Sequence, residues 1–315
     1  MQVILWLLFI SFTFALHSKP KHRFSRTIMI SNKYPDIGFQ KKIQSFSQLI
    51  RYKNIAPTML LCFTGGFLQT KNANALWKSK KFMTSSLITL FIMCNSMIIN
   101  DLFDMNVDKI NNPSRPLITG EITKKGAISL FSTITIINEL LAKQLPLALQ
   151  IYSRLAMIII TLYTPIFKKI PLMKNIVCAG LVSFSILFCG KSFPYNNELL
   201  YIAVQNVFAG SLHNEILLDI KDLEGDKQTN INTIPVLFGK KNAWKLVICI
   251  LLCNYIWVAY KMSYSSIPLL ITTLPIFHNL HNIQKNDFSK EEINNAVKNT
   301  NLPLFVSLLY LCSRV

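Results

Sequence analysis

Charged residues, and acids above all, are scarce in this chain. Its 315 residues include only 15 Asp and Glu, and charged residues of both signs make up 15% of the total. Soluble domains carry about 25% charged residues. Because 51% of the chain is also hydrophobic, the composition favours an integral membrane protein over a large soluble all-α enzyme.

Cysteine pairs that could bind zinc or build a disulfide framework are also missing. None of the seven cysteines belongs to a Cys-x-x-Cys pair, and all of them lie in apolar segments, which is typical of small buried hydrophobic residues. Despite a formal net charge of +18, no basic stretch accompanies a nucleic-acid-binding motif, so nucleic acid is not a predicted partner. Lys and Arg lie mostly between apolar blocks, as in loops at an anionic membrane surface, so membrane lipid is a predicted partner.

The apolar residues form long blocks rather than narrow helical stripes. They predict an all-α, multi-pass transmembrane bundle of about nine helices. The predicted helices are Ile55–Leu68, Phe82–Asn100, Ala127–Leu141, Leu147–Phe167, Asn175–Cys189, Leu199–Leu218, Ala243–Tyr260, Ile267–Leu280 and Leu302–Cys312. The longest polar links are predicted at Asp101–Lys125, Lys221–Lys241 and His281–Thr300.

The N-terminal region differs in composition from the rest of the chain. Residues 1–18 contain the apolar run Val3–Leu16, which is typical of a signal peptide although no basic residue precedes it. Residues 19–45 are basic and similar to a transit peptide, and we assign the membrane domain to residues 46–315. A signal-like run before a transit-like run resembles the bipartite leaders of proteins sent to plastids of secondary endosymbiotic origin. The alternatives are a plain membrane anchor followed by a solvated basic linker, and localisation in the endoplasmic reticulum.

Seven of the few acids are concentrated in two short runs at the ends of apolar blocks. The first run is Asn100–Asp108 and the second is Asp219–Asp226. Carboxylates packed this closely repel one another, by roughly 4 kcal/mol per pair at 4 Å with an effective dielectric constant near 20. A bound cation should therefore hold each run together, and a hard divalent cation with a phosphate-bearing ligand is the natural candidate.

The spacing of the acids supports this interpretation. If the helix continues past Asn100, residues at i, i+3, i+4, i+7 and i+8 project from one face, and the second run repeats the i, i+3, i+7 pattern. Asn and Asp oxygens without His or Cys suit Mg²⁺. We therefore predict that the two runs bind Mg²⁺ on either side of a diphosphate. The candidate metal ligands are Asn100, Asp101, Asp104, Asp108, Asp219, Asp222 and Asp226.

Basic residues near the two acidic runs are candidates for binding a diphosphate, since Lys and Arg stabilise the charge on a departing phosphate group. The predicted diphosphate-binding residues among them are Lys109, Arg115, Lys168 and Lys227. Lys169, Lys174 and Lys221 also lie near these segments.

The motifs of this chain resemble those of the UbiA superfamily of intramembrane prenyltransferases. The resemblance extends over roughly residues 45–315 and rests on Asn100-Asp101-x-x-Asp104-x-x-x-Asp108, Asn112-Pro113-x-Arg115-Pro116, Asp219-x-x-Asp222-x-x-Gly225-Asp226 and Thr233-Ile234-Pro235-Val236-x-x-Gly239. It implies a helical bundle with a central cavity open to lipid. It also implies that Mg²⁺ binds an isoprenyl diphosphate donor, whose prenyl group passes to a hydrophobic or membrane-associated acceptor.

The resemblance further implies roles for single residues. Asp101 and Asp219 would support the catalytic aspartates, and Tyr163 followed by Lys168 is similar to the family's Tyr-x(4)-Lys region. Arg51, before the first predicted helix, is similar to a basic residue often found there in the family and is implied to bind the diphosphate. The implied catalytic residues are Asp104, Asp108, Asp222, Asp226, Tyr163 and Lys168.

The sequence leaves the acceptor open. Its motifs are most similar to the branch that holds digeranylgeranylglyceryl-phosphate synthases, with homogentisate prenyltransferases and chlorophyll synthases nearby, so a glycerol-phosphate, aromatic or chlorin acceptor is expected. Two other functions are considered: a cation transporter with paired carboxylates and an Asp-rich terpene synthase or cyclase. The acids lie at the ends of apolar runs rather than in their middle, which disfavours the transporter. The helices lack a polar outer face, which disfavours a soluble synthase.

Overall fold

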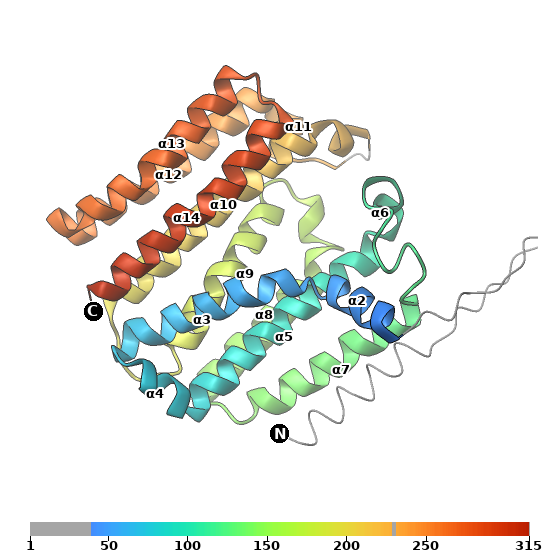
Figure 1. Ribbon diagram of the computed structural model, residues 1–315, viewed down its shortest axis with the longest axis horizontal. Coiled ribbons are helices and arrows are strands. Elements are labelled where there is room, and N and C mark those ends of the chain that lie inside the picture. Colours follow the sequence, from blue (N-terminus) through green and yellow to red (C-terminus); the bar gives the residue numbers. More distant parts are fainter. Residues whose placement is uncertain (1–38, 229–230, 315) are drawn as a thin grey trace, which may run out of the picture. The chain divides into compact units, whose positions relative to one another are not determined.

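The computed structural model describes residues 39–228 and 231–314. Within these two ranges all regular secondary structure is helical (Figure 1), so the predicted all-α class is confirmed. The signal-like segment and most of the transit-like segment lie outside the described residues. The described chain divides into two compact units.

The first unit comprises the described residues up to Pro57 together with Leu90–Thr164. Its buried core includes Leu49, Ile98, Leu117 and Leu130, and α7 packs against α8. Its helices are α2 (Phe39–Leu49), the C-terminal part of α5 (Lys80–Phe103), α6 (Met105–Asn111), α7 (Lys124–Ala142) and α8 (Leu147–Tyr163), with a 3₁₀ helix at Tyr52–Asn54.

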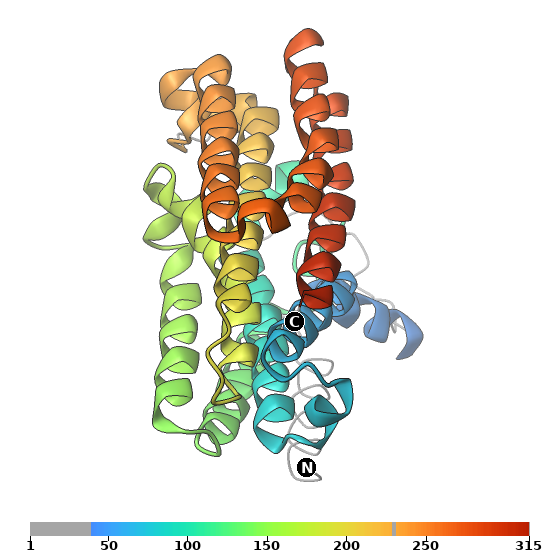
Figure 2. The ribbon, with the colours of Figure 1, turned by 90° about the vertical axis from the view of Figure 1, so that its left-hand side faces the viewer.

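The second unit comprises Thr58–Thr89 and the residues from Pro165 onward. Its longest helix is α10, which packs against α9, α12 and α14, and Figures 1 and 2 show α13 (orange) beside α14 (red). Its helices are most of α3 (Ile55–Thr70), α4 (Ala73–Lys78), the N-terminal part of α5, α9 (Met173–Gly190), α10 (Glu198–Gln228), α11 (Ile234–Phe238), α12 (Lys240–Met262), α13 (Ile267–Lys285) and α14 (Lys290–Ser313), with 3₁₀ helices at Phe167–Lys169 and Ser263–Ser266.

Each of the nine predicted helices coincides with an observed helix, but all three predicted polar links contain helical structure, the first of them α6. Helix α10 continues to Gln228 because Ile216, Ile220 and Leu223 keep an apolar face buried at helical spacing. Helix α14 begins at Lys290, where the Ser289 side chain caps it by accepting a hydrogen bond from the Glu292 backbone N–H. Helical structure therefore extends into the predicted links Lys221–Lys241 and His281–Thr300. Conversely, α8 ends at Tyr163, four residues before the predicted end.

Three segments of the described chain are long and apolar enough to cross a membrane: Lys80–Phe103, Met173–Gly190 and Lys240–Lys285. Large apolar side chains on the last segment point outward, for example Ile256, which is 68% exposed, and Ile271, which is 59% exposed. Apolar surface of this kind is costly in water and is accommodated by lipid. These are the features of an integral membrane protein.

Close packing of α3 against α9 depends on Gly65. A Cβ atom built on Gly65 would collide with the backbone carbonyl of Ile186 on α9, and a backbone group yields less readily than a flexible side chain. We expect Gly65→Ala to lower the unfolding temperature of the detergent-solubilised protein, since overpacking costs about 1–3 kcal/mol. Gly180→Ala on α9 is the matched control, because a Cβ there meets no atom within 4 Å. Equal unfolding temperatures for the two variants would contradict the prediction.

Candidate active site

The first acidic run surrounds a break between two helices. Helix α5 ends at Phe103, and Asp104, with φ −83° and ψ 5°, precedes the short helix α6. The helix thus continues three residues past Asn100, the predicted end, and is interrupted at Asp104. Two backbone hydrogen bonds of the helical type still cross the break: the Asp104 N–H donates to the Asn100 carbonyl at 2.9 Å, and the Asp108 N–H to the Asp104 carbonyl at 2.8 Å.

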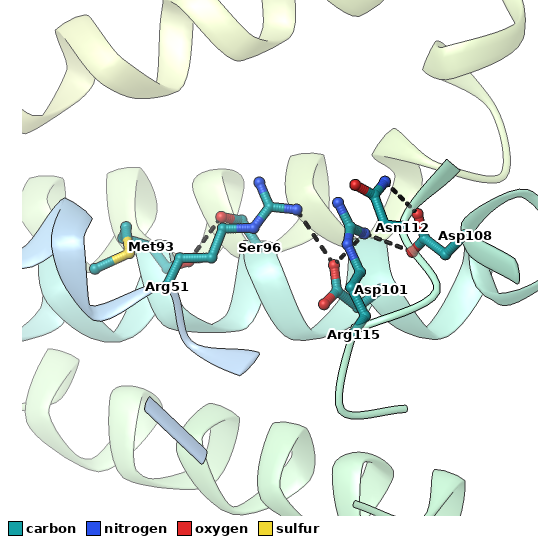
Figure 3. Close-up of polar contacts among 7 residues, drawn as sticks. All are labelled: Arg51, Met93, Ser96, Asp101, Asp108, Asn112 and Arg115. Atoms are coloured by element: carbon teal, nitrogen blue, oxygen red, sulfur yellow. Dashed lines mark hydrogen bonds and ion pairs between the residues drawn. The ribbon is translucent and has the colours of Figure 1, made fainter. Parts of the chain in front are cut away.

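Two of the predicted metal ligands pair with arginine (Figure 3). Arg115 Nη1 lies 2.8 Å from Asp101 Oδ1 and 2.5 Å from Asp108 Oδ2, and Arg51 Nη2 lies 3.3 Å from Asp101 Oδ1. Asn112 Nδ2 donates to Asp108 Oδ1 at 3.1 Å. The two aspartates are only 3% and 4% exposed, and buried carboxylates need such partners to stay charged. Arg115 thus joins the two ends of the first acidic run.

Arg51 reaches this cluster from a strained backbone. It precedes the 3₁₀ helix Tyr52–Asn54 with φ 51° and ψ 60°, in the left-handed region that costs a non-glycine residue about 1–3 kcal/mol. Its side chain points toward Asp101 in Figure 3. The structure therefore places the predicted residue Arg51 at the first acidic run, where its cationic group faces a buried carboxylate.

The second acidic run lies on one continuous helix, which extends past the predicted end at Leu218. Asp219, Asp222 and Asp226 all belong to α10. Their exposure differs: Asp219 is 3% exposed, whereas the Asp222 side chain is 60% exposed. Burial raises the pKa of the Asp226 carboxyl, which lies beyond the apolar part of α10, and the nearby positive charge of Lys174 opposes that rise.

The start of α9 supplies two partners for Asp219. Lys174 Nζ lies 2.5 Å from Asp219 Oδ1, and Asn175 Nδ2 donates to Asp219 Oδ2 at 2.8 Å. Lys174 also interacts electrostatically with Asp226 and Glu215. Lys174 is one of the basic residues expected near the acidic runs, whereas Asn175 was not predicted to take part. An amide at the start of an apolar helix is a signal that could have found it, because buried polar groups need partners.

The remaining predicted site residues lie on other elements of the two units. Tyr163 ends α8, and Lys168 lies in the 3₁₀ helix Phe167–Lys169 of the second unit. Lys109 on α6 and Lys227 near the end of α10 are exposed. The prediction that both acidic runs share one ligand stays a prediction.

The donor set of both acidic runs fits Mg²⁺. Among the described residues, no three His, Cys, Asp or Glu side chains are grouped so as to hold a metal ion by themselves. Mg²⁺ does not require such a group, since it usually keeps several waters and takes one or two carboxylates together with phosphate oxygens. The carboxylates and the Asn100 amide supply oxygen ligands, and none of the candidate ligands is a His or Cys.

Sequence comparison identifies the relatives of this chain. Residues 58–302 match the UbiA prenyltransferase family. The digeranylgeranylglyceryl phosphate synthase of Haloquadratum walsbyi is 28% identical over 222 residues, which cover 69% of this chain and 75% of that protein. The enzyme of the same name from Sulfolobus acidocaldarius is 28% identical over 254 residues, which cover 75% of this chain and 88% of the relative.

Solved structures show the same fold. A structure of digeranylgeranylglyceryl phosphate synthase matches with a TM-score of 0.70 at 22% identity, covering 86% of this chain and 97% of that one. A UbiA homologue from Archaeoglobus fulgidus bound to GPP and Mg²⁺ matches with a TM-score of 0.63 at 22% identity, covering 85% and 99% of the two chains. With the family match extending over most of its length, this chain belongs to the UbiA prenyltransferase family and is a membrane-embedded prenyltransferase.

Proposed function

We propose that this chain transfers a polyprenyl group from an isoprenyl diphosphate to a glycerol-phosphate lipid in a Mg²⁺-dependent reaction of isoprenoid biosynthesis. The observation that carries the proposal is the pair of Asp-rich runs, each of which places a cationic side chain against a buried carboxylate. The named relatives are digeranylgeranylglyceryl phosphate synthases. The product in this name carries two geranylgeranyl groups. Geranylgeranylglyceryl phosphate, which carries one, is therefore the proposed acceptor.

The metal ligands in this proposal come from both acidic runs. Asn100, Asp104 and Asp108 would serve the first site, and Asp222 and Asp226 the second, with Asp101 and Asp219 in support. Bound Mg²⁺ would stabilise negative charge on the diphosphate leaving group, a contribution of several kcal/mol.

The basic residues would bind the donor diphosphate. Arg115 already contacts two carboxylates, and its planar guanidinium has further N–H donors that suit phosphate oxygens. Lys168, with Arg51, Lys109 and Lys227, would add positive charge as the carbon–oxygen bond to the diphosphate breaks. Breaking of this bond leaves an allylic cation on the prenyl chain, which the π face of Tyr163 would stabilise. Apolar walls would keep water from that cation.

An assay in membranes tests the proposal. Membranes containing the protein should convert labelled geranylgeranyl diphosphate and geranylgeranylglyceryl phosphate into a doubly prenylated product, and chelation of Mg²⁺ should stop the reaction. Homogentisate and a chlorin alcohol acceptor belong in the same panel, because product with either of them instead would replace the proposed acceptor. Magnesium uptake without any prenylated product would favour the transporter.

We also propose that residues 1–45 act as a targeting leader for the membrane domain at 46–315. The support is compositional, an apolar run followed by a basic one. The plastid destination stays a prediction, and the archaeal relatives reported above do not support it. A fluorescent fusion of residues 1–55 should reach the plastid membrane system, and its retention in the endoplasmic reticulum would remove that destination.

A further inference from the structure

The first turn of α9 places a lysine among the carboxylates of the second acidic run. The Lys174 side chain is 17% exposed and the Asp219 side chain is 5% exposed, with Nζ and Oδ1 2.5 Å apart. The second oxygen of Asp219 accepts a hydrogen bond from the Asn175 amide. Both oxygens of Asp219 are thus engaged by residues of α9, in a setting that holds its carboxylate in one orientation.

Lys174 neutralises more than one acid. Its ammonium group contacts Asp219 and also feels the charges of Asp226 and Glu215, so one partly buried cation offsets the negative charge around it. An ammonium is a compact point charge with three donors and imposes no coordination geometry. It can therefore occupy a position between carboxylates where a second divalent ion would otherwise be needed to relieve their repulsion.

Asp219 and Asp222 differ in how freely they can meet a ligand. Asp219 is buried against α9, whereas most of the Asp222 side chain is exposed, with Lys221 Nζ 3.7 Å from its Oδ1. A metal ion that keeps waters and phosphate ligands needs accessible oxygens. Asp222 meets this requirement as it stands, whereas Asp219, like Asp108 in the first run, would first have to release a hydrogen-bond partner.

We propose that Lys174 is a positioning residue of the prenyl-transfer site, a resident cation anchored by Asp219 and Asn175 that partly neutralises the second acidic run in place of an additional metal ion. In this arrangement Asp219 orients Lys174 and does not bind metal. Asp222 and Asp226 are left as the metal ligands of this run. The inference rests on the proposed function and deepens it.

Metal binding to the purified full-length protein tests this role without any assay of activity. Mn²⁺ serves as the probe for Mg²⁺, and electron paramagnetic resonance of the free ion gives the bound fraction. Lys174→Met should tighten Mn²⁺ binding by about tenfold or add a further bound ion, because the nearby carboxylates then lack this cation. Lys191→Met is the matched control, at the opposite end of the same helix and roughly 25 Å away, and should leave Mn²⁺ binding unchanged. Unchanged or weaker binding in Lys174→Met would overturn the proposal.

A double variant keeps the test decisive if Lys174→Met fails to fold. Lys174→Met with Asp219→Leu removes both members of the buried pair, and replacing such a pair by apolar residues is often neutral for stability. The double variant should bind Mn²⁺ at least as tightly as the unmodified protein, since Asp222 and Asp226 remain. Weaker binding would mean that Asp219 is a ligand and would overturn the inference.

Asp226→Asn distinguishes a failure of the role proposed for Lys174 from a failure of the proposed metal site. Loss of Mn²⁺ binding in Asp226→Asn supports a metal site at the second run, so failure of the lysine variants alone would then concern only Lys174. Unchanged binding in Asp226→Asn would instead remove the metal site on which both proposals depend.

Discussion

Asp226→Ala should abolish prenyl transfer while leaving the protein in the membrane. Asp226 lies near the end of α10, and its carboxylate interacts with the charges of Lys174, Asp219 and Asp222. If it is a ligand of Mg²⁺, its loss removes stabilisation that develops only as the diphosphate departs. Losses of a single group of this kind lower kcat by about 10²–10³-fold or more. Labelled product formed per milligram of membrane protein is the measurement.

Glu224→Ala is the control for this substitution. Glu224 lies two residues earlier on the same helix, belongs to the same acidic run and is exposed. Its removal lowers the negative charge of the run by the same amount without touching a predicted ligand. Comparable loss of activity in both variants would indicate a general effect of charge, and full activity in Asp226→Ala would refute its role as a metal ligand. Asp104→Ala should behave as Asp226→Ala does.

The helices could be predicted because their apolar blocks are long. Each predicted range coincided with an observed helix, since a block such as Ala243–Tyr260 has few polar residues that would permit another structure. The ends were less accurate. Helix α14 includes the polar stretch from Lys290 to Thr300, in which only Ile293, Ala296 and Thr300 are buried, so its helical structure depends on a cap and on tertiary packing that hydropathy does not record.

The site was predictable in its residue types and not in its pairing. The i, i+3, i+7 spacing of Asp219, Asp222 and Asp226 suits a helix face, but hydropathy ended the predicted helix at Leu218, whereas α10 continues through the second run. The helix break at Asp104 could not be predicted, because neither proline nor glycine lies at this position. The contact between Lys174 and Asp219 joins residues 45 positions apart. It depends on how α9 packs against α10, which the spacing of motifs does not predict.

Arg115→Met should destabilise the first unit and also abolish activity. Arg115 is the shared partner of two buried carboxylates, Asp101 and Asp108. Removing one partner of a buried ion pair typically costs about 3–5 kcal/mol, because the remaining charge is left uncompensated. Arg51 lies at 3.3 Å from Asp101 only, so it cannot replace Arg115 at Asp108 without moving. A lower unfolding temperature in detergent, measured beside product formation, is the expected result.

Two further variants separate stability from catalysis at this position. Arg154→Met removes an arginine of the same unit whose pair with Glu139 is 43% and 38% exposed, and it should change the unfolding temperature little, since exposed pairs contribute little. Arg115→Met combined with Asp101→Asn and Asp108→Asn removes the cation together with both buried charges, and should recover much of the lost stability. It should not recover prenyl transfer, because the diphosphate would still lack a guanidinium and the metal would lack Asp108. Recovery of activity in this triple variant would show that Arg115 serves the fold alone.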